Sequence, residues 1–335
     1  MNTSEMKKMT YRDAIRLGMT EEMRRDDNVI FMGEDIGIYG GAFGVSHGMI
    51  DEFGEERILD TPISEATIVG TAVGAAATGL RPICEIMFMD FVTFAMDALV
   101  NQGAKMRYMF GGQSQVPMVL RLPAGSGTGA AAQHSQSLEA WLCHIPGLKV
   151  VTPSTPAQAK GLIKAAIRDN NPVCFIEHKL LYKIDDLVPL DEEFIIEIGK
   201  TLTERQGKDI TIVTYGSLLL KAMEAAAFLA EEGIEVEILN PATLYPMDMK
   251  PIVESVIKTG RVIVAHEAAK TGGLGGEIVA RIVESDAFDY LNAPIIRLAG
   301  LDVPIPYNKE LEAACVPQKI DFIRAVHRLI DSEQG

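Results

Sequence analysis

The feature that most constrains the fold is a regular alternation of short apolar runs, rich in β-branched residues, with stretches of helical periodicity. This alternation is typical of a parallel sheet covered by helices on both faces. In the first half, strands are expected at residues 29–32, 82–86, 116–122, 148–152 and 173–177, and helices at 11–25, 65–78, 91–108 and 156–169. In the second half, strands are expected at 210–215, 236–239, 261–265 and 295–298, and helices at 217–232, 248–259, 275–285 and 318–330. The sequence therefore predicts an α/β protein whose two halves are each doubly wound.

The stretch between the two halves interrupts this rhythm. Residues 179–208 carry scattered charges without a sustained period, so we place the boundary between two domains there. A chain of 335 residues also exceeds what a single hydrophobic core usually supports. We expect a first domain at residues 1–185, a linker at 186–208 and a smaller second domain at 209–335.

The charge balance excludes whole classes of partner. The chain carries 31 Lys and Arg against 46 Asp and Glu, a formal charge of −15, which repels nucleic acid and anionic membranes. With 47% hydrophobic and 23% charged residues, its composition is that of an ordinary globular protein. The sequence shows no apolar run long enough for a spanning helix and no secretory signal pattern.

The cysteines indicate a reducing compartment. They are far apart, form no Cys-x-x-Cys pair, and three of them lie in apolar surroundings typical of buried thiols. The four are Cys84, Cys143, Cys174 and Cys315. A cytoplasmic protein is the simplest interpretation.

A glutamate stands at the start of a helix of small residues. Because Pro62 cannot sit deep inside a helix, the helix is expected to begin at about residue 63 or 64, which puts Glu65 in its first turn. Gly70 and Gly74 recur on one face of this helix, and each interior glycine costs about 1 kcal/mol relative to alanine. Close approach to another helix, on a second chain, is the expected compensation. Taken alone, Glu65 could simply complement the helix dipole.

Two glycine-rich segments follow expected strands. Residues 124–130 lead to His134, and residues 271–277 precede an expected helix. Either loop could cradle a phosphate, but neither has the full glycine spacing of a dinucleotide fingerprint. We interpret the first as a mobile loop that holds the His134 imidazole in a cleft, and the second as a tight strand-to-helix turn. A histidine that merely satisfies backbone groups of the loop is the alternative for His134.

A further candidate lies where a helix runs into a strand at residues 166–172. Exposed carbonyl oxygens there, with the side-chain oxygens of Asp169 and Asn171, would suit a hard monovalent cation. Aspartate and asparagine before a proline also commonly do no more than end a helix, and this alternative stays open.

Taken together, these segments resemble the β-subunit of thiamine-diphosphate-dependent dehydrogenases that decarboxylate 2-oxo acids or cleave acetoin. The resemblance covers nearly the whole chain, and its most specific parts are Thr-Pro-Ile-Ser-Glu at residues 61–65 and Ala-Gln-His-Ser-Gln at residues 132–136. It is also carried by Gly33-Glu34-Asp35, Gly70 and Gly74, and residues 59–60, 79–85, 101–108, 137, 146–152, 160–172 and 258–273. It implies a pyrimidine-binding thiamine diphosphate domain followed by a transketolase C-terminal-like domain.

The resemblance also implies roles for particular residues. Glu65 stands where the family has the glutamate that binds the far ring nitrogen of the aminopyrimidine, so we expect its carboxyl to lie in a dry pocket. Phe91 matches the aromatic residue that stacks on that ring, although it could equally be a core phenylalanine. His134 matches a histidine at the mouth of the site, with an expected role in acyl transfer to the lipoyl group. In part of the family potassium is bound by the residues matching Met118, Ala166, Ile167, Asp169 and Asn171.

One absence bears on the partners. Such enzymes anchor diphosphate and magnesium through a Gly-Asp-Gly motif and a later asparagine, and this sequence contains no Gly-Asp-Gly. The resemblance therefore implies a separate α-subunit that supplies Mg²⁺ and the diphosphate site, in an α2β2 heterotetramer. It further implies docking of the second domain to the dihydrolipoyl acyltransferase core, whose basic binding domain would suit an acidic surface.

Two other functions remain as alternatives. A dinucleotide-binding oxidoreductase would use one of the glycine-rich loops. A non-catalytic assembly subunit would keep full turnover after Glu65→Gln. The substrate stays open among pyruvate, acetoin and a branched 2-oxo acid, although residues 101–105 and 108–112 look closer to acetoin- and pyruvate-type β-chains.

Overall fold

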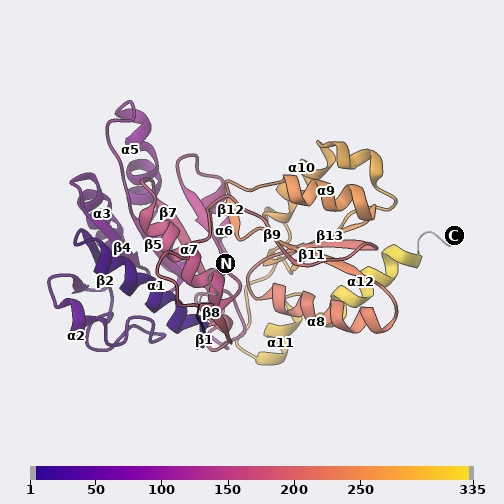
Figure 1. Cartoon of the computed structure of the whole chain (residues 1–335), viewed down its shortest axis with the longest axis horizontal. Helices are drawn as coiled ribbons and strands as arrows, with labels where there is room; N and C mark the ends of the chain where they lie inside the picture. Colours follow the sequence, from indigo (N-terminus) through magenta and orange to yellow (C-terminus); the bar gives the residue numbers. More distant parts are fainter. Residues whose placement is uncertain (1–4, 332–335) are drawn as a thin grey trace. The chain divides into compact units, whose positions relative to one another are not determined.

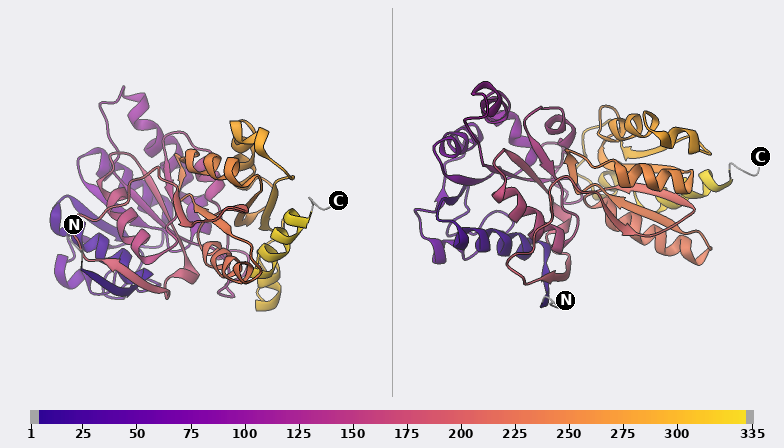
Figure 2. Two further views of the ribbon diagram at one scale, coloured as in Figure 1. Left: turned by 45° about the vertical axis from the view of Figure 1, so that its right-hand side comes forward. Right: turned by 45° about the horizontal axis from the view of Figure 1, so that its top comes forward.

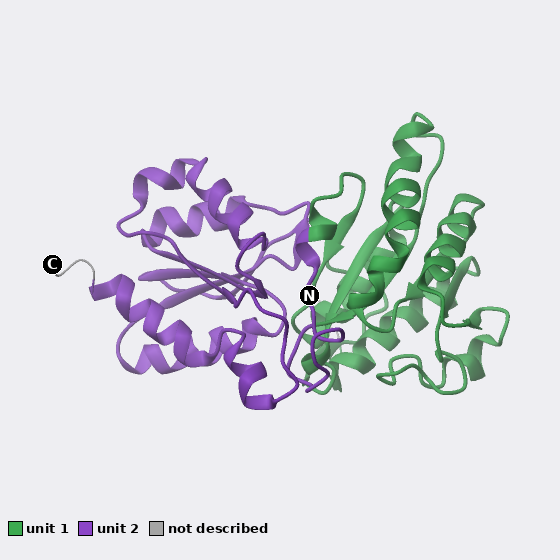
Figure 3. Cartoon of the chain, turned by 180° about the vertical axis from the view of Figure 1, so that it is seen from behind, with its two compact units in different colours: residues 1–124, 141–198 green, residues 125–140, 199–335 purple. Residues whose placement is uncertain are grey.

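The computed structural model describes residues 5–331, which form two compact units, each built around a mainly parallel sheet (Figure 1). Unit 1 contains residues 1–124 and 141–198, and unit 2 contains residues 125–140 and 199–335 (Figure 3). The α/β fold with two domains expected from the alternation of strands and helices is confirmed. The unit boundary at residues 198 and 199 lies inside the expected linker, and residues 125–140 pack with unit 2.

The sheet of unit 1 runs in the order β6-β7-β5-β4-β2-β3, and every neighbouring pair in it is parallel. Its strands are β2 (Val29–Gly33), β3 (Ile58–Asp60), β4 (Arg81–Glu85), β5 (Val119–Ala124), β6 (Lys149–Val151) and β7 (Val173–His178). A separate antiparallel pair joins β1 (Met6–Thr10) to β8 (Asp185–Pro189). This pair was not expected from the sequence, because its strands are short and largely exposed, with no apolar alternation.

The helices of unit 1 fall into two groups. In one group α1 (Tyr11–Arg25) packs along α7 (Pro156–Arg168), and in the other α3 (Glu65–Ala77) packs against the segment that follows β4. Local sequence explains where α1 and α7 begin. Thr10 caps α1 by accepting a hydrogen bond from the Asp13 N–H at 3.1 Å, and Thr155 caps α7 directly before Pro156. The remaining helical segments are α2 (Met49–Phe53), α6 (Glu139–Cys143) and η3 (Lys179–Leu181).

The segment after β4 differs from the single helix expected at residues 91–108. It is divided into a 3₁₀ turn η1 (Met89–Phe91), α4 (Val92–Met96), a π-helical stretch η2 (Asp97–Gly103) and α5 (Ala104–Met109). The π stretch places Gly103 against α3, because a Cβ at Gly103 would lie 3.2 Å from Val73 Cγ2. Periodicity in sequence could not distinguish this from a continuous α-helix, since one wider turn hardly changes the apolar pattern.

Unit 2 has the sheet order β14-β13-β10-β11-β9, in which β9 is the antiparallel edge. Its strands are β9 (Leu202–Arg205), β10 (Ile210–Thr214), β11 (Val236–Asn240), β13 (Val262–Ala269) and β14 (Ile296–Gly300), and β12 (Thr243–Tyr245) follows β11. Within the unit, α8 (Leu218–Glu231) and α12 (Lys319–Asp331) cover one face of the sheet, while α9 (Lys250–Thr259) and α10 (Gly275–Val283) cover the other (Figures 1 and 2). The remaining segments are η4 (Asp286–Tyr290) and α11 (Lys309–Ala314).

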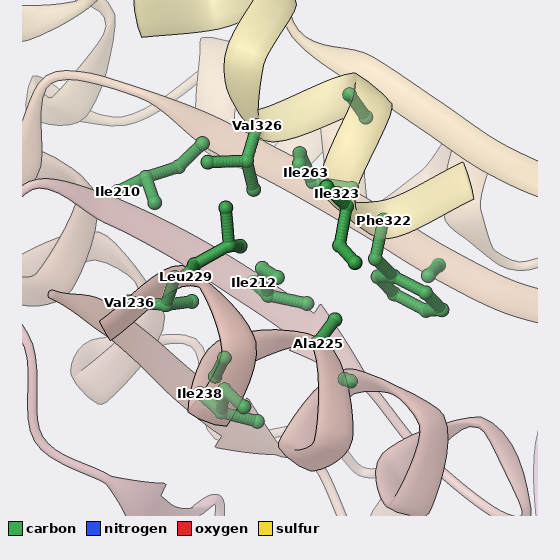
Figure 4. Packing of buried hydrophobic residues seen from close by; sticks show 14 of the residues in the cluster. Ile210, Ile212, Ala225, Leu229, Val236, Ile238, Ile263, Phe322, Ile323 and Val326 are labelled. Atoms are coloured by element: carbon green, nitrogen blue, oxygen red, sulfur yellow. The ribbon is translucent and has the colours of Figure 1, made fainter. Parts of the chain in front are cut away.

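The core of unit 2 explains why these sequences form helices and strands. On α8 the buried residues are spaced three or four apart, so one stripe faces the sheet. On α12 Phe322, Ile323 and Val326 form the matching stripe, and both stripes meet Ile212 of β10 (Figure 4). None of the helices within residues 5–331 is both long and apolar enough to span a bilayer.

Candidate active site

Glu65 is the first residue of α3, within two residues of the helix start expected from Pro62. Its N-cap Ser64 makes no side-chain hydrogen bond to the helix backbone; its hydroxyl pairs instead with that of Thr67 at 2.8 Å. The Glu65 carboxyl therefore lies at the positive end of the helix dipole. The expected dry pocket is incomplete in the chain by itself, because Glu65 is only half-buried.

A second carboxyl, that of Glu34, lies near Glu65, and no role was expected for it from the sequence. Glu34 follows β2, is 8% exposed, and its Oε1 has no hydrogen-bond partner among residues 5–331. Burial raises the pKa of Glu34, and the neighbouring charge of Glu65 raises it further. The motif Gly33-Glu34-Asp35 after a buried strand was the available signal. The structure thus combines a glutamate at a helix start with a buried carboxyl whose pKa is raised.

A buried ionic network lies across the same sheet. Arg121 of β5 is fully buried and donates two hydrogen bonds of 2.7 Å to Glu177 of β7. It also pairs with Glu85 of β4, whose pKa is raised by burial in spite of the guanidinium. The Tyr182 hydroxyl donates to Glu177 at 2.8 Å. One arginine therefore balances two carboxylates, and Glu85 also contributes to the raised pKa of Glu34.

Phe91 ends the 3₁₀ turn η1 and is half-buried. Its ring meets the ring of Phe88 edge to face, with centroids 6.2 Å apart. Phe88 is in turn packed against Phe43 at 5.6 Å. Phe91 is therefore held by an aromatic cluster at one side while part of its surface stays accessible, which suits a stacking role.

His134 belongs to the part of unit 2 formed by residues 125–140, so its position is described separately from that of Glu65. The imidazole is half-buried, and the His134 N–H donates to the Ala131 carbonyl at 3.3 Å in a turn where Ala131 has φ of +63°. A cavity of about 540 Å³ adjoins this segment. It is lined by Ala132 and Ser135–Leu138 on one side and by the end of β13 and residues 300–305 on the other.

The glycine-rich loop before His134 is filled by the protein's own carboxylates. Gly125, Gly127 and Gly129 all have φ between +71° and +98°, a region that favours glycine. The Ser126 N–H donates to Glu267 at 2.6 Å, and the Gly127 N–H donates to Glu312 at 2.6 Å. These N–H groups are therefore engaged within the chain and are not open to a dinucleotide phosphate.

The second glycine-rich loop is also used internally. The Thr271 N–H donates to Asp302 at 3.0 Å, and the Thr271 hydroxyl donates to the same carboxylate at 2.7 Å. A Cβ at Gly273 or Gly275 would lie 2.4 or 2.6 Å from the ring of His266, which is fully buried. The glycines are therefore needed for close packing, as a strand-to-helix turn requires.

The residues proposed for potassium lie together at the end of α7 and the starts of β5 and β7. The Met118 carbonyl accepts from the Val173 N–H at 2.9 Å, and the Ala166 carbonyl accepts from the Asp169 N–H at 3.2 Å. The Ile167 carbonyl accepts from Arg81 Nε at 2.9 Å. Each carbonyl oxygen keeps a second lone pair with which it could contact a cation.

Cationic side chains already contact this group. Asp169 accepts from both nitrogens of Asn171, at 2.8 and 2.9 Å, and pairs with Lys149. Asn171 Oδ1 accepts from Arg107 at 2.9 Å. The positive charges of Arg81 and Lys149 oppose a further cation at the same oxygens.

No three His, Cys, Asp or Glu side chains gather into a possible metal site in the part of the chain that the structure describes. The polar groups present suit an aminopyrimidine ring instead. Glu34 offers a buried oxygen without a partner, Glu65 a carboxyl at a helix start, and Phe91 an accessible ring. This donor set fits the pyrimidine half of thiamine diphosphate.

Comparison with known families agrees with this reading. The chain matches the family described as "Transketolase, pyrimidine binding domain" over residues 7–184 and "Transketolase, C-terminal domain" over residues 199–321. It is 48% identical over 323 residues to "Pyruvate dehydrogenase E1 component subunit beta" of Rhizobium meliloti (strain 1021), covering 96% of this chain and 70% of that one. It is 47% identical over 326 residues to "Pyruvate dehydrogenase E1 component subunit beta, mitochondrial" of Homo sapiens, covering 96% and 91%.

A solved structure supports the fold. The chain superposes with a TM-score of 0.78 on the structure titled "Split gene transketolase, inactive beta4 tetramer", at 22% sequence identity. The match covers 96% of this chain and 98% of the other. At this identity the likeness concerns the arrangement of helices and strands alone.

Proposed function

Because this chain belongs to the transketolase-like family of pyruvate dehydrogenase E1 β-subunits, we propose that it decarboxylates pyruvate together with a separate α-subunit. Thiamine diphosphate supplies, when bound, the carbon that attacks the substrate carbonyl. The acyl unit then passes to the lipoyl group of a dihydrolipoyl acyltransferase. The observation that carries this proposal is the Glu65 carboxyl at the start of α3 beside the buried Glu34.

In this proposal Glu65 exchanges a proton with the far ring nitrogen of the aminopyrimidine. Its position at the start of α3 places the carboxyl at the positive end of the helix dipole. Burial and the neighbouring charge of Glu65 raise the pKa of Glu34, so this second carboxyl is protonated more easily than an exposed one. Phe91 orients the ring by stacking.

His134 is proposed to donate a proton or stabilise charge during acyl transfer. Its segment adjoins a cavity of about 540 Å³ whose walls combine Leu138, Leu301 and Ile305 with the carboxylate of Glu267. Such a cavity, with apolar side chains beside polar ones that include the Glu267 and Asp302 carboxylates, is suited to an uncharged acyl carrier that can also form hydrogen bonds.

The α-subunit is proposed to bind the diphosphate and Mg²⁺ in an α2β2 heterotetramer. The open face of α3 supports this partner. Thr67, Gly70 and Gly74 are exposed there, and no described atom lies within 4 Å of a Cβ at Gly74. Ile63 before the helix is 83% exposed and Phe94 of α4 is 66% exposed. An apolar, small-residue face of this kind suits a helix of a second chain.

The proposal includes a docking partner, a bound cation and a location. The acyltransferase core would dock on unit 2, and the charge of −15 on the whole chain favours a basic partner. Potassium would bind at Met118, Ala166, Ile167, Asp169 and Asn171, in competition with Arg81 and Lys149. The location proposed is cytoplasmic, because the four cysteines are far apart and form no Cys-x-x-Cys pair.

The test is Glu65→Gln in the complex purified with its α-subunit. Dye reduction with pyruvate should fall by roughly 10²- to 10⁴-fold, because glutamine cannot exchange the proton. The α2β2 mass should stay normal in size-exclusion chromatography. Unchanged turnover would instead indicate a non-catalytic assembly subunit.

The same assay distinguishes substrates and cations. Wild-type enzyme is compared on pyruvate, acetoin and 2-oxoisovalerate, and the highest kcat/KM identifies the substrate. Replacing potassium by sodium should lower the rate if the cation site is used. A nicotinamide or flavin bound to the chain purified alone would favour the dinucleotide alternative.

A further inference from the structure

The glycine loop at residues 125–129 forms a nest of backbone N–H groups, and a carboxylate group of the same protein occupies it. Nests of this kind bind anions, because successive N–H groups point into one concavity. Here the anion comes from the same chain. Glu312 of α11 accepts from the Gly127 N–H at 2.6 Å and from the Gly129 N–H at 3.0 Å.

Glu312 depends on this loop for its charge balance. Its residue is 2% exposed, and a buried carboxylate without partners is strongly unfavourable. In the described part of the chain no cation pairs with it; its side-chain partners are the backbone N–H groups of the loop. The loop and the carboxylate therefore stabilise each other through charge-assisted hydrogen bonds.

Glu267 holds the beginning of the same loop. Its Oε1 accepts from the Ser126 N–H at 2.6 Å and from the Ser126 hydroxyl at 2.8 Å, while its Oε2 accepts from the Ser217 hydroxyl at 3.1 Å. The loop is closed on itself by the Gly125 N–H, which donates to the Gln136 carbonyl at 3.2 Å. The closure spans His134, so fixing the loop also fixes the backbone on both sides of the histidine.

We infer that Glu312, together with Glu267, is a positioning residue: the two carboxylates fill the glycine nest and so hold the segment that carries His134 for acyl transfer. This rests on the role proposed above for His134. The pair is named here the carboxylate clamp. Glu312 touches neither substrate nor cofactor in this proposal and acts only through the loop, whereas Glu267 also lines the cavity beside the segment.

The clamp predicts a defect in one partial reaction. In the α2β2 enzyme, Glu312→Ala should slow acylation of a free lipoyl domain by roughly 10²-fold, the scale expected when a reacting group is misplaced by about 1 Å. Dye reduction with pyruvate, which does not use the lipoyl group, should change little. Glu312→Gln keeps one accepting oxygen and should recover part of the rate. Glu310→Ala, which removes an exposed carboxylate from the same helix, is the matched control and should resemble wild type.

A double-mutant cycle tests whether Glu312 acts through His134. If it does, Glu312→Ala should slow lipoyl acylation strongly in the wild type but hardly further in His134→Asn. Amide hydrogen exchange of the peptide covering residues 125–140 should rise in Glu312→Ala and stay low in Glu310→Ala. Both results together support the clamp.

The failures are distinguishable. The clamp is overturned if exchange of residues 125–140 is unchanged in Glu312→Ala, or if the two substitutions slow acylation by independent factors. If His134→Asn itself acylates the lipoyl domain at the wild-type rate, the role proposed for His134 fails, and the positioning proposal fails with it. If His134→Asn acylates the lipoyl domain slowly while Glu312→Ala acylates it at the wild-type rate, only the clamp is overturned and the role proposed for His134 stands.

Discussion

Two helices of unit 1 carry interior glycines and use them in opposite ways. Gly18 of α1 lies against α7, where a Cβ would stand 2.5 Å from Ile163 Cγ2 and 3.1 Å from the Lys160 carbonyl. Gly74 of α3 has no described atom within 4 Å of such a Cβ. A glycine in a helical sequence thus indicates a close contact, but it does not tell whether the partner lies in the same chain.

The contact between α1 and α7 is also fixed by buried charges. Lys160 and Lys164 are fully buried on α7, and both pair with Glu21 of α1. No comparable ionic pairing covers the exposed face of α3 within residues 5–331. Gly275 of unit 2 makes the same kind of contact as Gly18, because a Cβ there would overlap the ring of the buried His266. The contrast is therefore between contacts completed by folding and a face of α3 that we propose is left for assembly.

The largest expected effect is a loss of stability in acid, which tests the close contact between His266 and Gly275. Burial lowers the pKa of His266 to about 4 from its ordinary 6.5, so the unfolded chain binds the proton more readily. Stability should therefore fall as the pH drops through this window, by roughly 3 kcal/mol from this residue. Urea unfolding of wild type and His266→Asn at several pH values measures the difference.

The comparison with His266→Asn separates this residue from the other titrating groups. As the pH falls from 6.5 to 4, the unfolding free energy of the wild type should decrease more than that of His266→Asn. A difference that stays constant with pH would show that the contact between His266 and Gly275 tolerates the charge.

The next effect tests the closed contact of α1. Gly18→Ala should lower the unfolding free energy by about 1–2 kcal/mol, because the clash with Ile163 and the Lys160 carbonyl outweighs the gain in helix propensity. Denaturant unfolding of the chain measures this. An unchanged or higher stability would mean that α1 and α7 shift apart without loss.

The smallest expected effect is a gain in stability, at the open glycine of α3. Gly74→Ala should raise the unfolding free energy of the chain alone by up to about 1 kcal/mol, since the added Cβ meets no described atom. In the presence of the α-subunit it should weaken assembly, measured by titration of one subunit with the other. If assembly is unaffected, the face of α3 that carries Gly74 is not the interface.

The sequence predicted the principal helices and strands well, and the reason is local. Residues 11–25 were expected as a helix and α1 spans Tyr11–Arg25; residues 173–177 were expected as a strand and β7 spans Val173–His178. α1 has a clear N-cap at Thr10, and β7 is a short apolar run that is buried throughout. The π stretch at Asp97–Gly103 and the pair of β1 with β8 escaped because neither leaves a distinct apolar period.

The candidate site was predictable only in part. Glu65, Phe91 and His134 came from their motifs, and their catalytic roles stay predictions. The raised pKa of Glu34 could not be derived, because it depends on burial and on the charge of Glu65. The glycine loop was interpreted from its spacing alone, which gives the positive φ angles but not the anion that they face.

By itself, then, the sequence determined the order of layers, the helix start that presents Glu65 and the absence of a dinucleotide fingerprint. Only the tertiary structure decided which groups meet: Ser126 with Glu267, 141 positions away, and Gly127 with Glu312, 185 positions away. The physical reason is that periodicity and capping depend on residues within a few turns. Burial, charge pairing and free surface depend instead on segments that come together only when the sheets form.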